Sequence, residues 1–474
     1  MHVAVIGAYG SAGAAAAETL SGHTDPTDPD APLDRLTLVD DGEPGGGLCI
    51  LRGCMPSKEV LSAAGHRYRA RHDDRLAGPA PGMDLDRVVE RKDEHVSSFA
   101  EHRRSAVHDI AAIEGVDFRH ETARFVGPHE LELSGGERLA PDYVVVASGS
   151  TLNVPDLPGI DEVSYMDSAA VLDATDLPDS GVVMGFGYVG LELVPYLAEA
   201  GVDLTVIEHD ERPLDDAPAP VGDEILDCYR EEFGVEILTG TREESLEATA
   251  DGGVRLHTDR DDDRATVEAE ELFLFTGRRP NLDGLNLDAT DLDPGPDWVD
   301  ATMRAVDDAT GRTFVVGDAN GRRPLLHVAK EQGYLAADNV LADARGDDLA
   351  EYDPITHRVV FSAAAVYPYA RVGHSAESAR AAGHDVIEVG REAADDGVFE
   401  TKAASRGLAR LVVDADDGTV LGYLGLHLHA DVMAKTMQVI VEDGADVREV
   451  PDRAFHPTTP EILDGLFREA SGAL

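Results

Sequence analysis

The first hydrophobic run of the chain leads into a glycine-rich turn. The segment HVAVIG at residues 2–7 predicts a buried strand, and glycines at positions 7, 10 and 13 follow before an alanine-rich stretch that predicts a helix. After a proline- and aspartate-rich loop, LTLVD at 36–40 predicts a second strand that ends at Asp40. In such a unit pyrophosphate lies at the helix N-terminus and the carboxylate reaches a ribose hydroxyl. Gly7, Gly10, Gly13 and Asp40 are therefore candidate dinucleotide-binding residues.

The spacing of this first turn departs from the G-x-G-x-x-G pattern of dinucleotide-binding folds. Either Ala8 replaces the first glycine or one residue is inserted after Gly7. Taken alone, the turn is equally compatible with a glycine-rich βα turn of an unrelated doubly wound fold.

A second strand, turn and helix follow the expected pattern. The segment VVMGFGYVGLELVPYLAEAGVDLTVIEHD places Gly185, Gly187 and Gly190 at the regular spacing and ends its second strand at Glu208. A carboxylate in that place hydrogen-bonds a ribose 2′-hydroxyl and repels a 2′-phosphate, which favours NADH. Arg212 lies nearby, so NADPH is a possible alternative. Two dinucleotide folds in one chain predict two dinucleotides.

Later strands divide the rest of the chain. DYVVVASGS (142–150), ELFLFTGRRPN (271–281) and TFVVGD (313–318) are strands that run into small-residue turns. Beyond residue 352 these turns stop, and alternating strands followed by helices predict an α+β domain. We predict an α/β protein with dinucleotide-binding domains at 1–150 and 151–281, a central segment at 282–352 that completes the first, and an α+β domain at 353–474.

The charge of the chain excludes nucleic acid as a partner. Its 474 residues contain 92 Asp and Glu against 40 Lys and Arg, a formal charge of −52, whereas binding a polyanion needs Lys and Arg to neutralise phosphates. Anionic membranes are disfavoured for the same reason. Acidity beyond what solubility requires, with only five lysines, favours a cytosolic protein of a halophile.

Hydropathy and cysteine usage agree with that compartment. No run of eighteen apolar residues is present, and the first strand begins so close to the initiator Met that no room is left for a signal peptide. Three cysteines do not form a secreted disulfide framework. We expect a cytoplasmic protein.

Two of the cysteines lie together in GGGLCILRGCMPSK at 45–58, directly after the second strand. Four residues separate Cys49 from Cys54, so one helical turn could bring the sulfurs within bonding distance. No further Cys or His follows at a ligand spacing, so we expect no metal site. Two incidental buried thiols are a weak alternative in a chain with so few cysteines, and because a cytosolic pair is more often catalytic than structural, we favour a redox-active disulfide.

With this segment the sequence resembles the pyridine nucleotide-disulfide oxidoreductases, the family of dihydrolipoamide dehydrogenase, glutathione reductase and mercuric reductase. The resemblance covers nearly the whole chain. Its motifs stand in the family's order: the cysteine segment ending in PSK, ASGS, GFGYVGLE, FTGRRPN, VVGD, LLHVAKEQG and HPTTPE.

The resemblance implies a role for each catalytic candidate. Cys49 would be the interchange thiol that attacks the substrate disulfide, and Cys54 would lie against the flavin. His456, oriented by Glu461, would be the general acid and base, acting from the other subunit of a homodimer. Lys58 would lie beside the flavin and pair with Glu192. Tyr188 would cover the nicotinamide pocket as a gate.

The resemblance also implies FAD as the bound cofactor, with Asp318 holding its ribityl chain. The remaining residues that it places near FAD or the nicotinamide nucleotide are Gly46, Gly47, Ser148, Gly149, Gly277 and His327.

The substrate stays open between two disulfides. The chain lacks a C-terminal cysteine pair and an N-terminal metal-binding domain, which disfavours mercuric ion, and Glu18 and Thr19 stand where glutathione reductases carry Arg. The halophilic composition points to bis-γ-glutamylcystine, towards which we lean, although an expected NADPH preference conflicts with Glu208. Dihydrolipoamide dehydrogenase is the alternative, supported by Glu208 and His327 and opposed by the irregular first turn and by residues 359–373.

A flavin-binding redox sensor without turnover is a third hypothesis, because a fold does not fix a function. The complete set of catalytic candidates argues against it. Cys228, alone in the second dinucleotide domain, is expected to be structural.

Overall fold

The computed structural model describes residues 1–28, 30–453 and 455–474, and contacts divide them into two compact units. Unit 1 comprises Met1–Pro56, Arg91–Asn153 and Arg278–Pro354. Unit 2 comprises Ser57–Glu90, Val154–Gly277 and Ile355–Leu474. Helices α3 (Cys54–His72) and α4 (Leu85–Ala111) contribute residues to both units.

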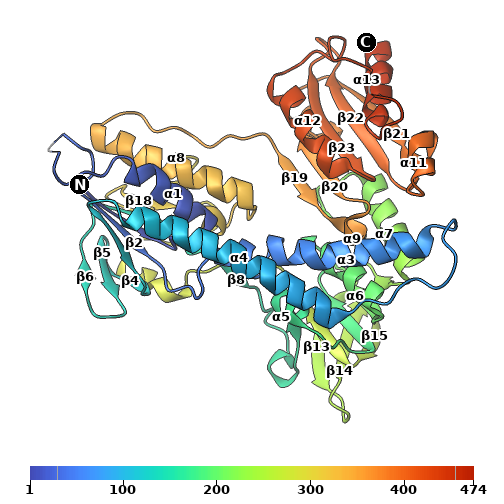
Figure 1. Cartoon of the computed structure of the whole chain (residues 1–474), viewed down its shortest axis with the longest axis horizontal. Helices are drawn as coiled ribbons and strands as arrows, with labels where there is room; N and C mark the ends of the chain where they lie inside the picture. The colour runs from blue at the N-terminus through green and yellow to red at the C-terminus, as the bar shows by residue number, and fades with distance from the viewer. Residues whose placement is uncertain (29, 454) are drawn as a thin grey trace. The chain divides into compact units, whose positions relative to one another are not determined.

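Unit 1 is built around a five-stranded parallel sheet in the order β18-β7-β1-β2-β3 (Figure 1). The strands are β1 (His2–Ile6), β2 (Arg35–Val39), β3 (Val116–Arg119), β7 (Tyr143–Val146) and β18 (Thr313–Val315). Strands β1 and β7 are almost entirely buried, as expected for parallel strands covered on both faces. Strand β18, from the segment after residue 278, pairs in parallel with β7 and so adds this segment to the sheet that contains β1.

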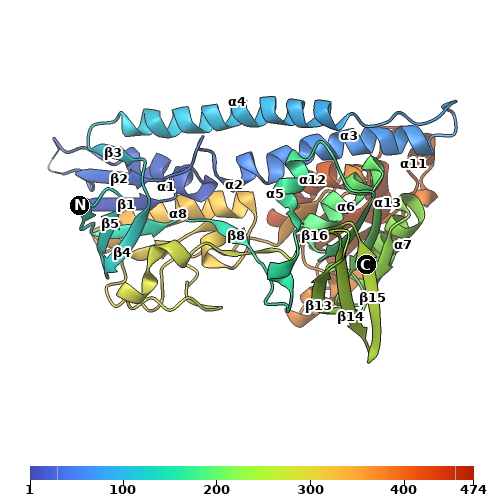
Figure 2. The same ribbon diagram turned by 90° about the horizontal axis from the view of Figure 1, so that it is seen from below.

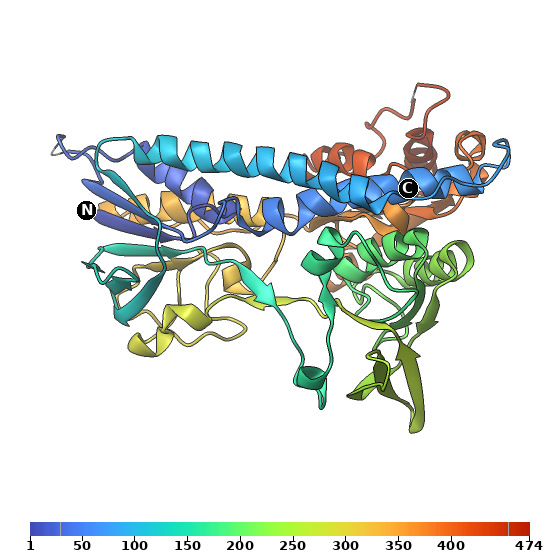
Figure 3. The same ribbon diagram turned by 60° about the horizontal axis from the view of Figure 1, so that its bottom comes forward.

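Helices and two small sheets complete unit 1. Helix α1 (Ser11–Ser21), rich in alanine, packs along α8 (Leu326–Arg345), and the two lie side by side in Figures 1 and 3. The short helix α2 (Gly47–Leu51) precedes α3. One small sheet contains β4 (Ala123–Gly127), β5 (Glu130–Leu133) and β6 (Arg138–Leu139), and the other pairs β8 (Ser150–Leu152) with β17 (Arg278–Pro280).

Unit 2 contains a second parallel sheet of the same design, in the order β12-β11-β10-β16-β9. Its strands are β9 (Met166–Asp167), β10 (Ser180–Met184), β11 (Asp203–Ile207), β12 (Glu236–Leu238) and β16 (Glu271–Leu274). Helices α5 (Ser168–Asp173), α6 (Tyr188–Ala200) and α7 (Ala219–Phe233) accompany it. Strands β13 (Arg242–Ala248), β14 (Val254–Arg260) and β15 (Asp263–Ala269) form an antiparallel sheet beside β16 (Figure 2).

The C-terminal part of unit 2 is an antiparallel sheet with helices, in the order β19-β20-β23-β22-β21. The strands are β19 (His357–Val360), β20 (Tyr369–Gly373), β21 (Val386–Glu392), β22 (Leu408–Asp414) and β23 (Val420–Leu426). The helices are α9 (Ser362–Ala365), α10 (Ala376–Ala381), α11 (Gly397–Thr401), α12 (Ala430–Glu442) and α13 (Glu461–Ala473). The predicted fold class, two dinucleotide-binding folds with a C-terminal α+β domain, is confirmed.

The units cut the chain differently from the four predicted domains. Residues 57–90 belong to unit 2, because Val60, Leu61 and Ala64 of α3 are buried in the same hydrophobic core as α6 and the C-terminal sheet. The four-domain division stays a prediction. Within the described residues no helix is both long and apolar enough to span a membrane.

Candidate functional site

The two glycine turns are built alike. Gly7 has a φ angle of +91°, and a Cβ atom on it would lie 2.2 Å from the carbonyl oxygen of Ala147. Gly185 has a φ angle of +98°, and its Cβ atom would lie 2.5 Å from the carbonyl oxygen of Phe275. Only glycine satisfies both conditions. The last glycine of each turn, Gly13 or Gly190, packs against the carbonyl oxygen of the first, where a Cβ atom would lie 2.1 or 2.5 Å away.

This equivalence decides how the first turn departs from the usual spacing. Gly10 directly precedes α1, as Gly187 directly precedes α6. The first turn therefore has one inserted residue between its first and middle glycines. The alternative that Ala8 replaces the first glycine is wrong, because Gly7 itself occupies that place.

The longer turn carries Tyr9, whose contacts the sequence did not predict. The Tyr9 backbone N–H donates to Asp40 Oδ2 at 2.8 Å, and its hydroxyl lies 2.8 Å from His108 Nε2 on α4. Asp40 Oδ1 accepts from the Gly42 N–H at 2.8 Å. Burial raises the pKa of Asp40. These hydrogen bonds hold the Asp40 carboxylate in place after β2. In the sequence, only the extra residue of the first glycine turn hinted at the contacts of Tyr9.

Other residues of unit 1 fit the FAD that the resemblance implies. The Oγ atom of Ser148, which follows β7, is buried and has no hydrogen-bond partner among the described residues. A buried hydroxyl of this kind can donate a hydrogen bond to a bound cofactor. Ser150 Oγ donates to Asp318 Oδ2 at 2.6 Å, so Asp318 is held beside the turn that contains Gly149. His327 lies in the first turn of α8. A glycine turn at a helix N-terminus with a carboxylate after the next strand accommodates a dinucleotide.

The cysteine segment is anchored on the first glycine turn. A Cβ atom on Gly47 would lie 2.9 Å from the Cα atom of Gly10, so this close packing requires glycine. Gly46 precedes α2. Cys49 therefore belongs to a helix whose first residue touches the candidate pyrophosphate site.

Cys49 and Cys54 do not share one helical turn, contrary to the simplest expectation from their spacing. Cys49 lies in α2, Arg52 departs from helical geometry with φ −143°, and Cys54 begins α3. Cys49 is half-buried and Cys54 is exposed. No disulfide joins the cysteines in the described residues, and the redox-active disulfide stays a prediction.

Arg103 brings a positive charge to this region. Its Nη1 donates to the Tyr9 carbonyl at 3.2 Å. Burial lowers the pKa of Arg103, and the negative charge of Cys49 opposes that effect. A cation near a cysteine favours the thiolate form. Arg103 is thus a candidate site residue that the sequence did not indicate.

In unit 2 the structure pairs Lys58 of α3 with Glu192 of α6. The Lys58 Nζ atom lies 2.8 and 2.7 Å from the two carboxylate oxygens. Glu192 also accepts from the Phe361 N–H at 3.2 Å, and Lys58 Nζ lies 4.5 Å from the centre of the Phe361 ring. Phe361 thus contacts both members of the pair, Glu192 through its backbone N–H and Lys58 through its ring. The role of the pair towards flavin stays a prediction.

The nucleotide candidates of unit 2 surround the second glycine turn. Tyr188 is the first residue of α6 and is 39% exposed. Glu208 follows β11 directly, accepts from the Asp210 N–H at 2.9 Å, and has a pKa raised by burial. Gly277 lies in the turn after β16. Glu208 thus stands in unit 2 where Asp40 stands in unit 1.

His456 and Glu461 form a pair at the start of α13. Both carboxylate oxygens lie 3.1 Å from His456 Nδ1, and Glu461 also accepts from the Thr458 N–H at 2.9 Å. The hydrogen bond with His456 is the largest cause of the lowered pKa of Glu461. The histidine side chain is 80% exposed, so the imidazole is accessible to an incoming group.

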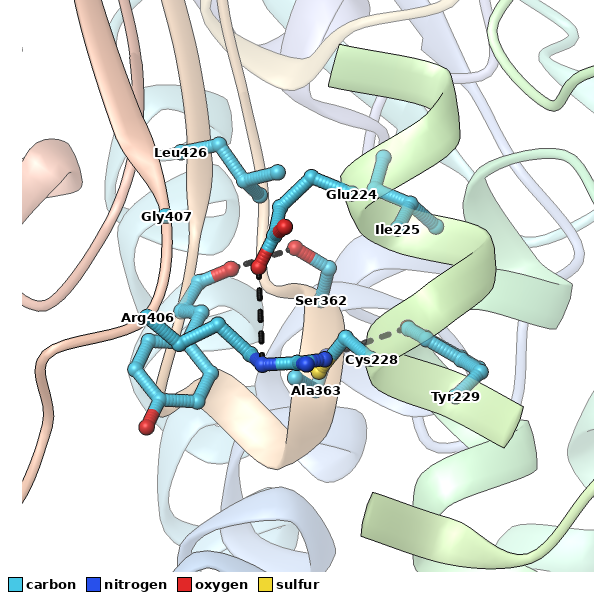
Figure 4. A pocket seen from close by; sticks show the side chains of 10 residues that line it. Glu224, Ile225, Cys228, Tyr229, Ser362, Ala363, Arg406, Gly407 and Leu426 are labelled. Carbon is cyan, nitrogen blue, oxygen red and sulfur yellow. Dashed lines mark hydrogen bonds and ion pairs between the residues drawn. The ribbon is translucent and has the colours of Figure 1, made fainter. Parts of the chain in front are cut away.

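A pocket beside Cys228 is not a second active site. Figure 4 shows Cys228, Arg406, Glu224 and Ser362 around it. Its volume of about 10 Å³ holds one water molecule at most. Burial raises the pKa of the Cys228 thiol to about 12, which keeps it protonated and unreactive. Among the described residues no cluster could hold a metal ion.

Comparisons with known proteins agree with this geometry. Residues 1–333 match the model of the pyridine nucleotide-disulphide oxidoreductases, and residues 357–466 match the dimerisation domain of the same proteins. A dihydrolipoyl dehydrogenase of Halobacterium salinarum is 29% identical over 92% of this chain and 91% of its own length. A mercuric reductase of Bacillus cereus is 27% identical over 72% of this chain and 52% of its own.

Solved structures share the fold. The HOCl-induced flavoprotein disulfide reductase RclA of Escherichia coli superposes with a TM-score of 0.82 at 22% identity, covering 99% of both chains. LpdA of Mycobacterium tuberculosis superposes with a TM-score of 0.82 at 21% identity, again over 99% of both chains.

Proposed function

The chain belongs to the pyridine nucleotide-disulphide oxidoreductase family of FAD-dependent enzymes, and from this premise we propose that it reduces a low-molecular-weight disulfide such as bis-γ-glutamylcystine. The observation that carries the proposal is the pair Cys49 and Cys54, anchored through Gly47 on the first glycine turn. Bound FAD would supply a hydride acceptor that passes an electron pair to the cysteine pair.

The chain's own residues divide the thiol chemistry. Cys49, supported by the charge of Arg103, attacks the substrate disulfide, and Cys54 is its resolving partner. His456, oriented by Glu461, protonates the departing thiolate. The match of residues 357–466 to a dimerisation domain supports a homodimer in which His456 serves the partner's cysteines.

The second glycine turn receives the nicotinamide nucleotide. Glu208 supports NADH, because its carboxylate accepts from a ribose hydroxyl and repels a phosphate. Tyr188, at the start of α6, would act as a gate to the nicotinamide pocket, and the Lys58–Glu192 pair would supply a positive charge that stabilises reduced flavin.

Dihydrolipoamide dehydrogenase is the second candidate function. Glu208 and His327 support it, and so does the 29% identity with dihydrolipoyl dehydrogenases of Halobacterium salinarum and Haloarcula marismortui. The acidic composition supports γ-glutamylcysteine chemistry in a halophile equally.

The deciding experiment is kcat/KM in molar KCl for bis-γ-glutamylcystine, lipoamide and glutathione disulfide, each with NADH and with NADPH. Dominant turnover of bis-γ-glutamylcystine supports the first proposal. Dominant lipoamide turnover with NADH supports the second, and turnover of none of the three contradicts both.

Gly187→Ala is expected to weaken nicotinamide nucleotide binding by about tenfold or more, because the middle glycine lets the backbone approach pyrophosphate. A Cβ atom there meets no protein atom within 4 Å, so the fold and FAD content should not change. Isothermal titration with NAD⁺ measures the effect. Gly397→Ala, equally open and outside the turn, is the matched control, and equal affinity in both variants would place the nucleotide elsewhere.

Glu208→Ser is expected to shift the NADH to NADPH ratio of kcat/KM by about tenfold towards NADPH, because repulsion of the 2′-phosphate is lost. Initial rates with each nucleotide give the ratio. Glu211→Ser, a control at a carboxylate that is 88% exposed, should leave it unchanged. An unaltered ratio in Glu208→Ser would mean that this carboxylate does not meet the ribose.

A further inference from the structure

The hydroxyl of Tyr188 is held by an arginine from the C-terminal sheet. Arg358 on β19 donates from Nη1 to the Tyr188 hydroxyl at 2.6 Å, and its guanidinium carbon lies 5.9 Å from the centre of the Tyr188 ring. The Arg358 side chain is only 12% exposed, whereas Tyr188 is 39% exposed. A largely covered cation thus donates to the hydroxyl of an exposed aromatic side chain.

Arg358 is itself held by a carboxylate that it shares with a second arginine. Arg358 and Arg371 stand directly opposite each other on β19 and β20, and both bind the carboxylate of Asp216. Arg371 Nη1 also donates to the Asp216 carbonyl at 2.9 Å. Asp216 lies in the loop that leads into α7. One carboxylate therefore compensates two opposed guanidinium groups, whose mutual repulsion would otherwise destabilise the sheet.

This cluster joins two parts of unit 2. Tyr188 follows Gly187 and begins α6, the helix whose N-terminus can bind the pyrophosphate of a dinucleotide. Arg358 and Arg371 belong to the C-terminal sheet. The position of the Tyr188 ring is consequently set by the C-terminal sheet as well as by its own helix.

We propose that Arg358 is a positioning residue that latches Tyr188 by its hydroxyl, and that the nicotinamide nucleotide must release this latch to bind. The inference rests on the proposed gate role of Tyr188. A hydrogen bond to a charged donor is among the stronger ones, so the latched form is favoured in the free enzyme. Only unlatched molecules can bind the nucleotide, so the apparent affinity is the intrinsic affinity multiplied by the unlatched fraction.

Removing either end of the latch should therefore tighten binding. Arg358→Met and Tyr188→Phe are each expected to lower the dissociation constant of NAD⁺ by about five- to tenfold, and the double variant should gain nothing more. Isothermal titration of the FAD-loaded enzyme measures this without any disulfide substrate. The result therefore does not depend on whether the proposed disulfide is the substrate. Tyr188→Phe deletes one exposed hydroxyl and keeps the test available if Arg358→Met does not fold.

A second readout follows the tyrosine itself. In enzyme containing 3-fluorotyrosine, the ¹⁹F resonance of residue 188 is identified by its loss in Tyr188→Phe. Arg358→Met should shift and narrow that resonance, because the ring becomes mobile. Saturating NAD⁺ should move the wild-type resonance in the same direction.

Arg371→Met is the matched control, because the Arg371 side chain is 8% exposed against 12% for Arg358 and binds the same carboxylate, but makes no hydrogen bond to Tyr188 in the described structure. Its NAD⁺ affinity should stay within about twofold of wild type, and its Tyr188 resonance should not move. Equal effects in both arginine variants would show a general structural cost and overturn the latch. Unchanged affinity and resonance in Arg358→Met would overturn it as well.

Discussion

Cys49→Ser is expected to lower disulfide reduction by more than about 10³-fold, because a serine hydroxyl cannot replace the attacking thiolate in disulfide exchange. FAD should remain bound, since the FAD candidates Gly7, Gly10 and Asp40 are unaltered. The rate is measured with the best disulfide substrate, and reduction of ferricyanide by NADH provides the activity that does not require the cysteine pair.

Cys228→Ser is the matched control for this substitution. Cys228 is buried, and burial raises the pKa of its thiol to about 12, so its removal can cost stability but should leave the chemistry in place. Full turnover by Cys49→Ser would refute the thiol mechanism. Loss of turnover in both variants alike would indicate unfolding rather than chemistry.

His456→Ala is expected to slow thiol exchange by about 10²- to 10⁴-fold, the usual contribution of a general acid and base. Glu461→Gln should give a smaller loss, because the carboxylate only orients the imidazole through Nδ1. Stopped-flow reoxidation of the reduced enzyme by substrate isolates this step. His384→Ala removes another histidine that is paired with a carboxylate, that of Asp414, and should have no effect.

Mixed dimers test whether His456 serves the partner subunit. Combining inactive Cys49→Ser and His456→Ala subunits should restore roughly a quarter of wild-type activity, since half of random dimers are mixed and each has one complete site. No recovery in dimers that have exchanged subunits would place His456 and the cysteines of one chain in the same site.

Local sequence patterns predicted both glycine turns, because each requires glycine at positions where a side chain would collide with backbone. Gly185 and Gly190 show the regular spacing, and Gly7 and Gly13 keep the same contacts despite the inserted residue. The pairing of Lys58 with Glu192 joins residues far apart in sequence, and it was foreseen only through the family resemblance.

Other features could not be predicted from the sequence. The spacing of Cys49 and Cys54 fits one helical turn as well as the break at Arg52 that the structure contains. Tyr9 and Arg103 belong to the candidate site through hydrogen bonds with residues about thirty or more positions away in the chain. The periodicity of a sequence does not encode such contacts. Arg358 follows no motif, and its contact with Tyr188 depends on the register of β19 against β20.

The central claim is that Cys49 and Cys54 form a disulfide that the nicotinamide nucleotide reduces through FAD. Titrating the thiols of denatured enzyme before and after anaerobic incubation with NADH or NADPH tests it directly. The chain has three cysteines, so the oxidised enzyme should show one thiol, that of Cys228, and the reduced enzyme three. Three thiols before reduction, or one thiol after incubation with either nucleotide, would contradict the account.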